Sequence, residues 1–286
     1  MPCFFKNLKT DLMKNLKIKA VALSFSMSLL HFNCSTVRSA FMPEISQDAA
    51  LGKQTDNEIR SKPKEFPLLP EQGNAEVYGY VRQITRNILN SGNVEHAKDF
   101  AWEVKIINDP KTLNAFCTPG GYIYVYTGLI KYLDSEDQLA GVLGHEIAHA
   151  DKRHSMQQMV DLYGVQLLAG LATSATTRGK SAGTQQTAET IAQVATALVG
   201  LKFSRNHETE ADNMSVAYLC GTEYNSDGAA GFFKKIGSAG SPPEFLSTHP
   251  NPTNRVENIE AQAAARSCNG HMSNQAQYAR IKSLLR

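Results

Sequence analysis

The chain has 286 residues, 42% of them hydrophobic, and a formal net charge of +2 at pH 7. This length fits one sizeable domain with appendages or two small domains, and the apolar content suffices for a buried core. The small net charge, without a basic run interleaved with aromatic residues, excludes the electrostatic footprint of a nucleic-acid-binding protein, so no nucleic acid is expected as a partner.

The N-terminus has the pattern of a targeting segment. Three lysines precede an apolar run over residues 20–30, which is too short to span a bilayer and has the length of a signal-peptide core. We therefore expect residues 1–33 to be a signal peptide and the protein to be exported. Cys34 follows, but His31 stands where a lipoprotein signal normally has leucine. Lipidation of Cys34 and simple cleavage therefore both stay open.

The next segments predict two helices and then strands. A linker leads into an acidic-polar helix over residues 44–60, and apolar residues at helical spacing predict a second helix over residues 74–90. Residues 102–107 are rich in β-branched side chains and predict a strand. Residues 113–116 and the alternating strand 122–126, separated by two glycines, have the pattern of a hairpin.

One helix carries the motif His-Glu-x-x-His. His145 and His149 are four residues apart, so both imidazoles project from one helix face, where they can hold a single zinc ion. Glu146 lies beside the metal in a position that suits a general base for a metal-bound water. A histidine pair on a helix also occurs for purely structural reasons, so this interpretation requires a third ligand.

The helix that carries this motif is predicted to be long. Ser135 is its expected N-cap, Gln138 completes a capping-box pattern, and no proline interrupts the run to Met159. On a regular helix His154 lies about 140° away from His149, too far round to bind the same metal. We interpret His154 as structural.

Two segments rich in small and aliphatic residues follow, over residues 155–172 and 185–203. Polar side chains interrupt both, so neither is a convincing membrane span. We expect a core helical hairpin that returns the chain to the histidines. A lid or a membrane-surface contact is the alternative.

The third metal ligand is expected just beyond this hairpin. Glu208 and Asp212 share a helix face, whereas Glu210 points away from it. Glu208 completes a His, His, Glu ligand set with a fourth position open for water. Asp212 is expected to accept the distal N–H of a ligand histidine and so to orient that ring. Considered alone, the segment is equally an acidic helix with solvated charges.

Three cysteines lie outside the N-terminal region. In an oxidising compartment Cys220 and Cys268 can pair and leave Cys117 free, although pairing is not determined by spacing.

Four segments, in order, resemble the zinc metallopeptidases that include the CAAX-prenyl proteases, HtpX and the mitochondrial Oma protease. They are residues 114–128, the His-Glu-x-x-His motif, the Glu208 segment, and a His-Pro element that runs from His249 to Arg255. The nearest likeness is to the periplasmic, outer-membrane-associated branch typified by LoiP and BepA. The chain ends before it can hold the tetratricopeptide repeats that follow the catalytic domain in BepA-like proteins.

The resemblance implies an α+β fold, mainly α: a zincin-type metalloprotease domain over residues 73–286, with residues 34–72 as an N-terminal linker and helix. A small antiparallel sheet is expected beside the active-site helix. Its edge strand is expected to bind an extended peptide through the backbone. The residues of that strand expected to bind substrate are Gly121, Tyr122, Ile123 and Tyr124.

The resemblance also assigns chemical roles. It implies one zinc ion per chain, with Glu146 as the base that takes a proton from the attacking water. His249 is expected near the zinc, where it either stabilises the oxyanion or occupies the open coordination position in a resting, self-inhibited form. Arg255 either stabilises charge in the transition state or braces that loop.

The expected function is that of a zinc endopeptidase in the periplasm, anchored to the outer membrane through a lipidated Cys34. Its expected substrates are misfolded or stalled cell-envelope proteins, and the outer-membrane assembly machinery is a candidate partner. Two alternatives stay open. One is a zinc-stabilised chaperone or scaffold with little proteolytic activity, and the other is a zinc hydrolase that acts on a non-peptide substrate.

Overall fold

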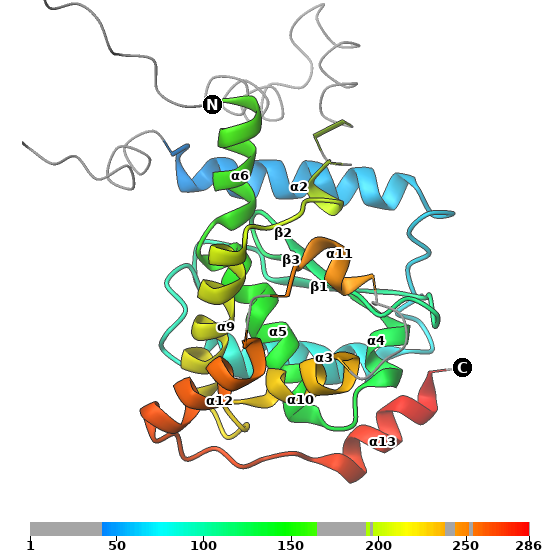
Figure 1. Cartoon of the computed structure of the whole chain (residues 1–286). Helices are drawn as coiled ribbons and strands as arrows, with labels where there is room; N and C mark the ends of the chain where they lie inside the picture. The colour runs from blue at the N-terminus through cyan, green and yellow to red at the C-terminus, as the bar shows by residue number, and fades with distance from the viewer. Residues whose placement is uncertain (1–41, 165–192, 195–196, 238–243, 252–253, 286) are drawn as a thin grey trace, which may run out of the picture. The chain divides into compact units, whose positions relative to one another are not determined.

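Helices dominate the architecture, and a small sheet lies among them (Figure 1). The computed structural model describes residues 42–164, 193–194, 197–237, 244–251 and 254–285. The strands are β1 (Glu103–Ile107), β2 (Ala115–Thr118) and β3 (Tyr122–Tyr126). The helices are α2 (Ile45–Ser61), α3 (Ala75–Leu89), α4 (Thr127–Tyr132), α5 (Glu136–Asp151), α6 (His154–Tyr163), α9 (Arg205–Cys220), α10 (Gly228–Gly237), α11 (Phe245–Thr248), α12 (Arg255–Arg266) and α13 (Gln275–Leu284).

The α+β, mainly α fold class is confirmed by these elements. Phe41–Arg286 group into one compact unit, which includes α2. The predicted signal peptide and Cys34 lie outside the described residues, as do residues 165–172 and 185–192 of the two segments predicted at residues 155–172 and 185–203. In the part of the chain that the structure describes, no helix has the length and apolar character needed to cross a bilayer.

The sheet is mixed, because its strand order is β1-β3-β2. The hairpin makes β2 antiparallel to β3, with Thr118 opposite Tyr122, whereas β1 runs parallel to β3, with Glu103 opposite the same Tyr122. The prediction of an antiparallel sheet therefore holds for one of the two strand pairs. β3 is the central strand, because β1 pairs with the edge that the hairpin leaves open.

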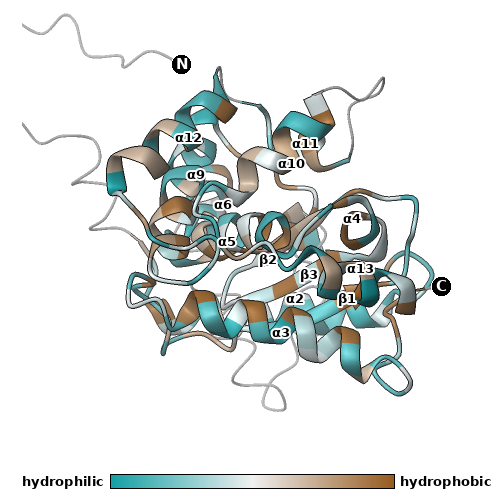
Figure 2. Ribbon diagram, turned by 90° about the horizontal axis from the view of Figure 1, so that it is seen from below, coloured by the Kyte–Doolittle hydropathy of each residue, from teal (hydrophilic) through white to brown (hydrophobic). Residues whose placement is uncertain are grey.

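The core lies between the sheet and the helices. α3 buries one face, which includes Val81, Ile84 and Ile88, and its ribbon carries both hydrophobic and hydrophilic residues in Figure 2. α5 is almost wholly buried and packs against α3, β2, α9 and α10. Two glycines permit this close packing. A Cβ at Gly141 would lie 2.1 Å from the backbone nitrogen of Ala229, and one at Gly144 would lie 2.7 Å from a side-chain oxygen on α9.

The start of α5 differs in detail from the prediction. Ser135 is the N-cap with an extended backbone, but its side chain makes no capping hydrogen bond. Gln138 accepts a hydrogen bond from the backbone N–H of Asp134, at 3.0 Å, so the capping box is not formed. The carboxylate of Glu136 instead accepts hydrogen bonds from the buried Tyr80 and from Asn274.

The prediction that this helix runs to Met159 is wrong, because α5 ends at Asp151 and the chain then turns sharply. Arg153 has a left-handed backbone conformation with φ of 58°, and α6 begins at the next residue. The Arg153 guanidinium donates to both carboxylate oxygens of Asp48 on α2, at 3.0 and 2.6 Å, and to the Pro43 carbonyl, at 2.6 Å. These contacts stabilise a conformation that non-glycine residues seldom adopt.

One disulfide joins the end of α9 to the chain beyond α12. Cys220 and Cys268 are bonded, with 48 residues of sequence separation, and Cys117 is a free, buried thiol. The pairing considered from the sequence is therefore confirmed. Because α9 and α12 pack together, the bond ties the far ends of two helices whose other ends reach the candidate site.

Candidate metal centre

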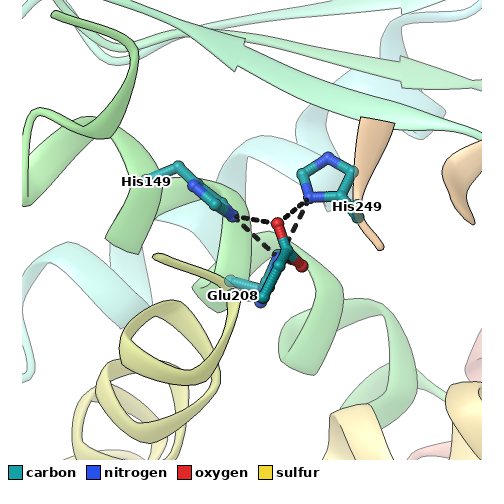
Figure 3. A group of neighbouring side chains, drawn as sticks. His149, Glu208 and His249 are labelled. Atoms are coloured by element: carbon teal, nitrogen blue, oxygen red, sulfur yellow. Dashed lines mark hydrogen bonds and ion pairs between the residues drawn. The ribbon is translucent and has the colours of Figure 1, made fainter. Parts of the chain in front are cut away.

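Four side chains from three parts of the chain converge on one point (Figure 3 shows three of them). His145 and His149 come from α5, Glu208 from the first turn of α9, and His249 from the residue that ends α11. All four are fully buried, and one ligand atom from each lies within 4.8 Å of the other three. Sequence reasoning predicted the first three as ligands. His249 now lies beside them.

The spacing of the ligand atoms fits a tetrahedral metal ion. His145 Nε2 lies 3.0 Å from His149 Nε2 and 3.3 Å from His249 Nδ1. Glu208 Oε1 lies 3.4 Å from His149 Nε2 and 3.1 Å from His249 Nδ1. Metal–ligand bonds of 2.0–2.1 Å in a tetrahedron place neighbouring ligand atoms about 3.3 Å apart. Three imidazoles and one carboxylate are also the donor types that zinc prefers.

Local structure explains why Glu208 and His249 reach this point. Ser204 caps α9 by accepting a hydrogen bond from the backbone N–H of His207, which places Glu208 in the first turn, facing α5. The backbone of Thr248 accepts a hydrogen bond from Phe203, just before α9, and the Phe245 ring stacks on His249 with centroids 4.3 Å apart. The loop of His249 is thus tied to the segment that leads into α9.

Asp212 and Arg255 surround the ligands. Asp212 Oδ1 lies 2.9 Å from His145 Nδ1, the ring nitrogen that points away from the convergence point. Arg255 Nη2 donates to the same oxygen, at 2.7 Å, and lies 3.1 Å from Glu208 Oε2. The guanidinium also lies over the Phe233 ring, 3.6 Å from its centroid. Arg255 therefore braces two carboxylates of the site, whereas its two expected roles, stabilising charge in the transition state or bracing the His249 loop, stay predictions.

Glu146 is buried, and neither oxygen of its carboxylate has a hydrogen-bond partner among the described residues. The Nε2 of His249 lies 3.6 Å from its Oε1, too far for a direct hydrogen bond. Burial raises the pKa of Glu146. A carboxylate with unused acceptor capacity and a raised pKa is suited to accept a proton from a water molecule beside it.

The ligands differ in protonation when no metal is bound. Burial lowers the pKa of the His145 imidazole, but the Asp212 and Glu208 carboxylates raise it by more than burial lowers it, so the pKa is about 9. Burial holds the pKa of His149 well below its ordinary value. Burial raises the pKa of Glu208, but His249 and the other imidazoles lower it more, so the net shift is downward.

The free thiol of Cys117 lies on β2. Burial, together with the charge of Glu146, raises its pKa well above the ordinary value. A thiol in this environment is not ionised near neutral pH and is therefore unsuited to nucleophilic catalysis.

His154 is the residue of the site that sequence reasoning misplaced. The argument from a regular helix kept it away from His149, but the turn at Arg153 brings the two rings together. His154 Nδ1 lies 3.0 Å from His149 Nδ1, and His154 Nε2 lies 3.2 Å from Glu210. Nothing in the local sequence pattern marks Arg153 as left-handed, because its conformation depends on a distant helix.

The predicted substrate strand is also misplaced. Gly121, Tyr122, Ile123 and Tyr124 belong to or adjoin the central strand, whose two edges are already paired. The side chain of Tyr124 donates to Asp56 on α2, at 2.6 Å. These residues therefore do not form an edge that can bind a peptide. Alternating hydrophobicity indicates a strand but does not say which strand is outermost. β2 is the outer strand on the side next to α5.

The sequence was compared with known proteins. Residues 76–263 match peptidase family M48. Mitochondrial metalloendopeptidase OMA1 of Schizosaccharomyces pombe is 30% identical over 189 residues, 63% of this chain and 51% of that protein. The putative beta-barrel assembly-enhancing protease of Vibrio cholerae is 31% identical over 163 residues, 54% of this chain and 33% of that protein. Metalloprotease YcaL of Escherichia coli is 24% identical over 245 residues, 85% of this chain and 88% of that protein.

The chain spans about half the length of the OMA1 relative, a third of the Vibrio relative and most of YcaL. The family match contains the His-Glu-x-x-His helix, Glu208, His249 and Arg255. It also extends over more than half of the chain. The predicted resemblance is therefore confirmed: the chain belongs to peptidase family M48.

Proposed function

We propose that this protein is a zinc-dependent endopeptidase. The observation that carries the proposal is the convergence of four buried metal-ligating side chains beside a buried carboxylate, Glu146, that has no hydrogen-bond partner. His145, His149 and Glu208 would hold the ion. A zinc ion held there supplies Lewis acidity toward a scissile carbonyl and toward a water molecule.

In this proposal Glu146 acts as the general base. Its carboxylate accepts a proton from the attacking water and later passes a proton to the leaving amine. Asp212 accepts a hydrogen bond from the Nδ1–H of His145, which leaves Nε2 as the ligand atom and holds the ring in place. Arg255 pairs with the carboxylates of Asp212 and Glu208 and holds them in place.

His249 occupies the fourth ligand position in the resting form. Its Nδ1 lies at ligand-to-ligand distance from both His145 and Glu208, where a substrate carbonyl or a water would otherwise be placed. Of the two roles expected for His249, this geometry supports self-inhibition. His249 must move away before a peptide can be cleaved, and its Nε2 can then meet the developing oxyanion.

We place substrate binding on β2 in place of β3. The Asn114 carbonyl accepts a hydrogen bond from the Tyr126 N–H, so Asn114 and Phe116 hold the positions that hydrogen-bond to β3. The backbone groups of Ala115 and Cys117, at the alternate positions, therefore point toward the outer side of the strand. An extended peptide that adds to this edge would lie beside α5 and its metal ligands. Main-chain capture of this kind tolerates many sequences, as an enzyme that clears damaged proteins requires.

The expected substrates are misfolded or stalled proteins of the cell envelope, with the outer-membrane assembly machinery as a candidate partner. Relatives named beta-barrel assembly-enhancing protease support this assignment. The Cys220–Cys268 disulfide supports an oxidising compartment such as the periplasm. A lipid on Cys34 would anchor the protein to the outer membrane.

One observation favours a second candidate. Zinc sites with four protein ligands are commonly structural, whereas catalytic sites keep a position open for water. With His249 in place this site has four, which favours a zinc-stabilised chaperone or scaffold. Glu146 distinguishes the two functions, because a structural site has no use for a buried carboxylate without partners.

The test uses the mature protein and its Glu146→Gln variant, with bound zinc and casein cleavage measured on both. The peptidase proposal expects about one zinc on each protein and cleavage by the unmodified protein alone. Zinc on both without cleavage, even after His249→Ala, would support the scaffold. Absence of zinc from the unmodified protein would overturn the metal centre itself.

A further inference from the structure

A second pair of side chains continues the metal centre toward the surface. His154 is fully buried, and its two ring nitrogens face different partners. Nδ1 lies 3.0 Å from Nδ1 of the ligand His149, and Nε2 lies 3.2 Å from a carboxylate oxygen of Glu210, whose side chain is 52% exposed. His149, His154 and Glu210 thus form one line from the buried ligand cluster to solvent.

Only one arrangement of protons satisfies every contact on this line. His149 faces the convergence point with Nε2, so a bound metal requires its proton on Nδ1. That N–H donates to His154 Nδ1, which must therefore be an acceptor. His154 then carries its proton on Nε2 and donates it to Glu210.

We propose that His154 and Glu210 form a hydrogen-bonded relay that fixes the tautomer and orientation of the metal ligand His149. This inference rests on the proposed metal site and adds two positioning residues to it. The other ligand histidine, His145, reaches its carboxylate directly, at Asp212, whereas His149 reaches one through a second imidazole. Groups that orient ligand histidines in this way typically change metal affinity 10- to 100-fold when removed.

The packing around His154 holds the relay in place. The left-handed turn at Arg153, stabilised by Asp48 on α2, directs the His154 ring back toward α5. His207 on α9 stacks on the same ring, with centroids 4.4 Å apart and planes 13° from parallel. A ring fixed on two sides loses little further freedom when it accepts the hydrogen bond from His149, so the orientation of the ligand is preset.

The experiment measures the rate at which the zinc-loaded mature protein, or a variant of it, releases zinc to an excess of a coloured chelator. His154→Phe keeps a ring in the stack but removes both hydrogen bonds, and it should speed zinc release by about 10- to 100-fold. His154→Gln can still accept from His149 and donate to Glu210, and it should restore most of the slow release. A purely structural role for the ring predicts the opposite order, with Phe the milder change.

Glu210→Gln tests the surface end of the relay without disturbing the fold. Gln still accepts from His154 but without charge, so zinc release should speed up a few-fold. Glu95→Gln is the matched control. It removes the same charge from a carboxylate that is 65% exposed and lies 3.2 Å from Lys152, with no imidazole between it and the metal. It should leave zinc release unchanged.

Three results would decide the matter. Equal rates for Glu210→Gln and the unmodified protein, with His154→Phe no faster than His154→Gln, would overturn the relay and leave the metal centre standing. Zinc bound and released as expected, but no peptide cleavage by either the unmodified protein or His249→Ala, would overturn the proposed peptidase and leave the relay standing. No zinc on the unmodified protein would overturn both.

Discussion

His249 lies between the metal ligands and the candidate base: its Nε2 is 3.6 Å from Glu146 Oε1, and its Nδ1 is 3.1 Å from Glu208. In the proposed function, this one imidazole takes the fourth ligand position and the space next to Glu146 that the attacking water needs. We therefore infer that His249 must move before the proposed reaction can occur.

We predict that His249→Ala increases casein cleavage by the purified protein. Removing the imidazole opens the fourth position to water and frees Glu146 to accept its proton. Loss of one ligand should also weaken zinc binding, so cleavage is measured with zinc in excess. Unchanged zinc binding together with a loss of cleavage would show that His249 assists the reaction and does not block it.

Glu146→Gln should retain zinc and lose peptidase activity. General acid–base groups typically contribute about 10²- to 10⁴-fold to rate, and the neutral amide cannot accept the proton of water. The amide has nearly the size of the carboxylate it replaces, so folding should be unaffected. The kcat for a fluorogenic peptide is the quantity to measure, and an active Glu146→Gln protein would exclude Glu146 as the base.

Zinc binding should release a proton near neutral pH. The pKa of His145 is raised to about 9 in the metal-free site, so this imidazole is protonated at pH 7 and must lose its Nε2 proton to bind the ion. Zinc affinity should therefore rise about tenfold per pH unit from pH 7 and level off as the pH passes about 9. Calorimetry in buffers of different ionisation enthalpy counts the protons.

Asp212→Asn provides the control for that titration. The Asp212 carboxylate is one of the two groups that raise the pKa of His145, so its loss should move the levelling-off to lower pH. If the two proteins show the same pH dependence, another group carries the released proton.

Gly141→Ala should destabilise the fold even though alanine favours helices by about 1 kcal/mol. Its Cβ would lie 2.1 Å from the backbone nitrogen of Ala229, so α5 and α10 would have to separate. We expect a net loss of about 1–3 kcal/mol in the free energy of unfolding. Gly79→Ala on α3 has open space around its Cβ and should gain about 0.5–1 kcal/mol. Urea unfolding of both variants measures the contrast.

Removing the disulfide should destabilise the protein by about 4 kcal/mol, from the chain entropy of a loop closed over 48 residues of sequence separation. The Cys220→Ala, Cys268→Ala double variant is compared with the unmodified protein in urea, with and without a reductant. The reductant should lower the stability of the unmodified protein alone. An equal response in both proteins would assign the effect to something other than this bond.

Much of the metal centre was determined by the sequence itself. The positions of His145, Glu146 and His149 follow from helical periodicity, which is local: a spacing of four residues places two side chains on one face in any helix. The same reasoning places Glu208 and Asp212 together on α9. The strands β1 and β3 and the helices α2 and α3 follow from local patterns in the same way.

Tertiary contacts decided the rest. The turn before α6 depends on Asp48, about a hundred residues from Arg153, and it moves His154 from the wrong side of a predicted helix to hydrogen-bonding distance of His149. β3 became central because β1 pairs beside it, and alternating hydrophobicity is the same for a central and an edge strand. The position of His249 between the ligands and Glu146 likewise depends on long-range packing. Local pattern selects which side chains can do chemistry, whereas distant contacts decide which of them meet.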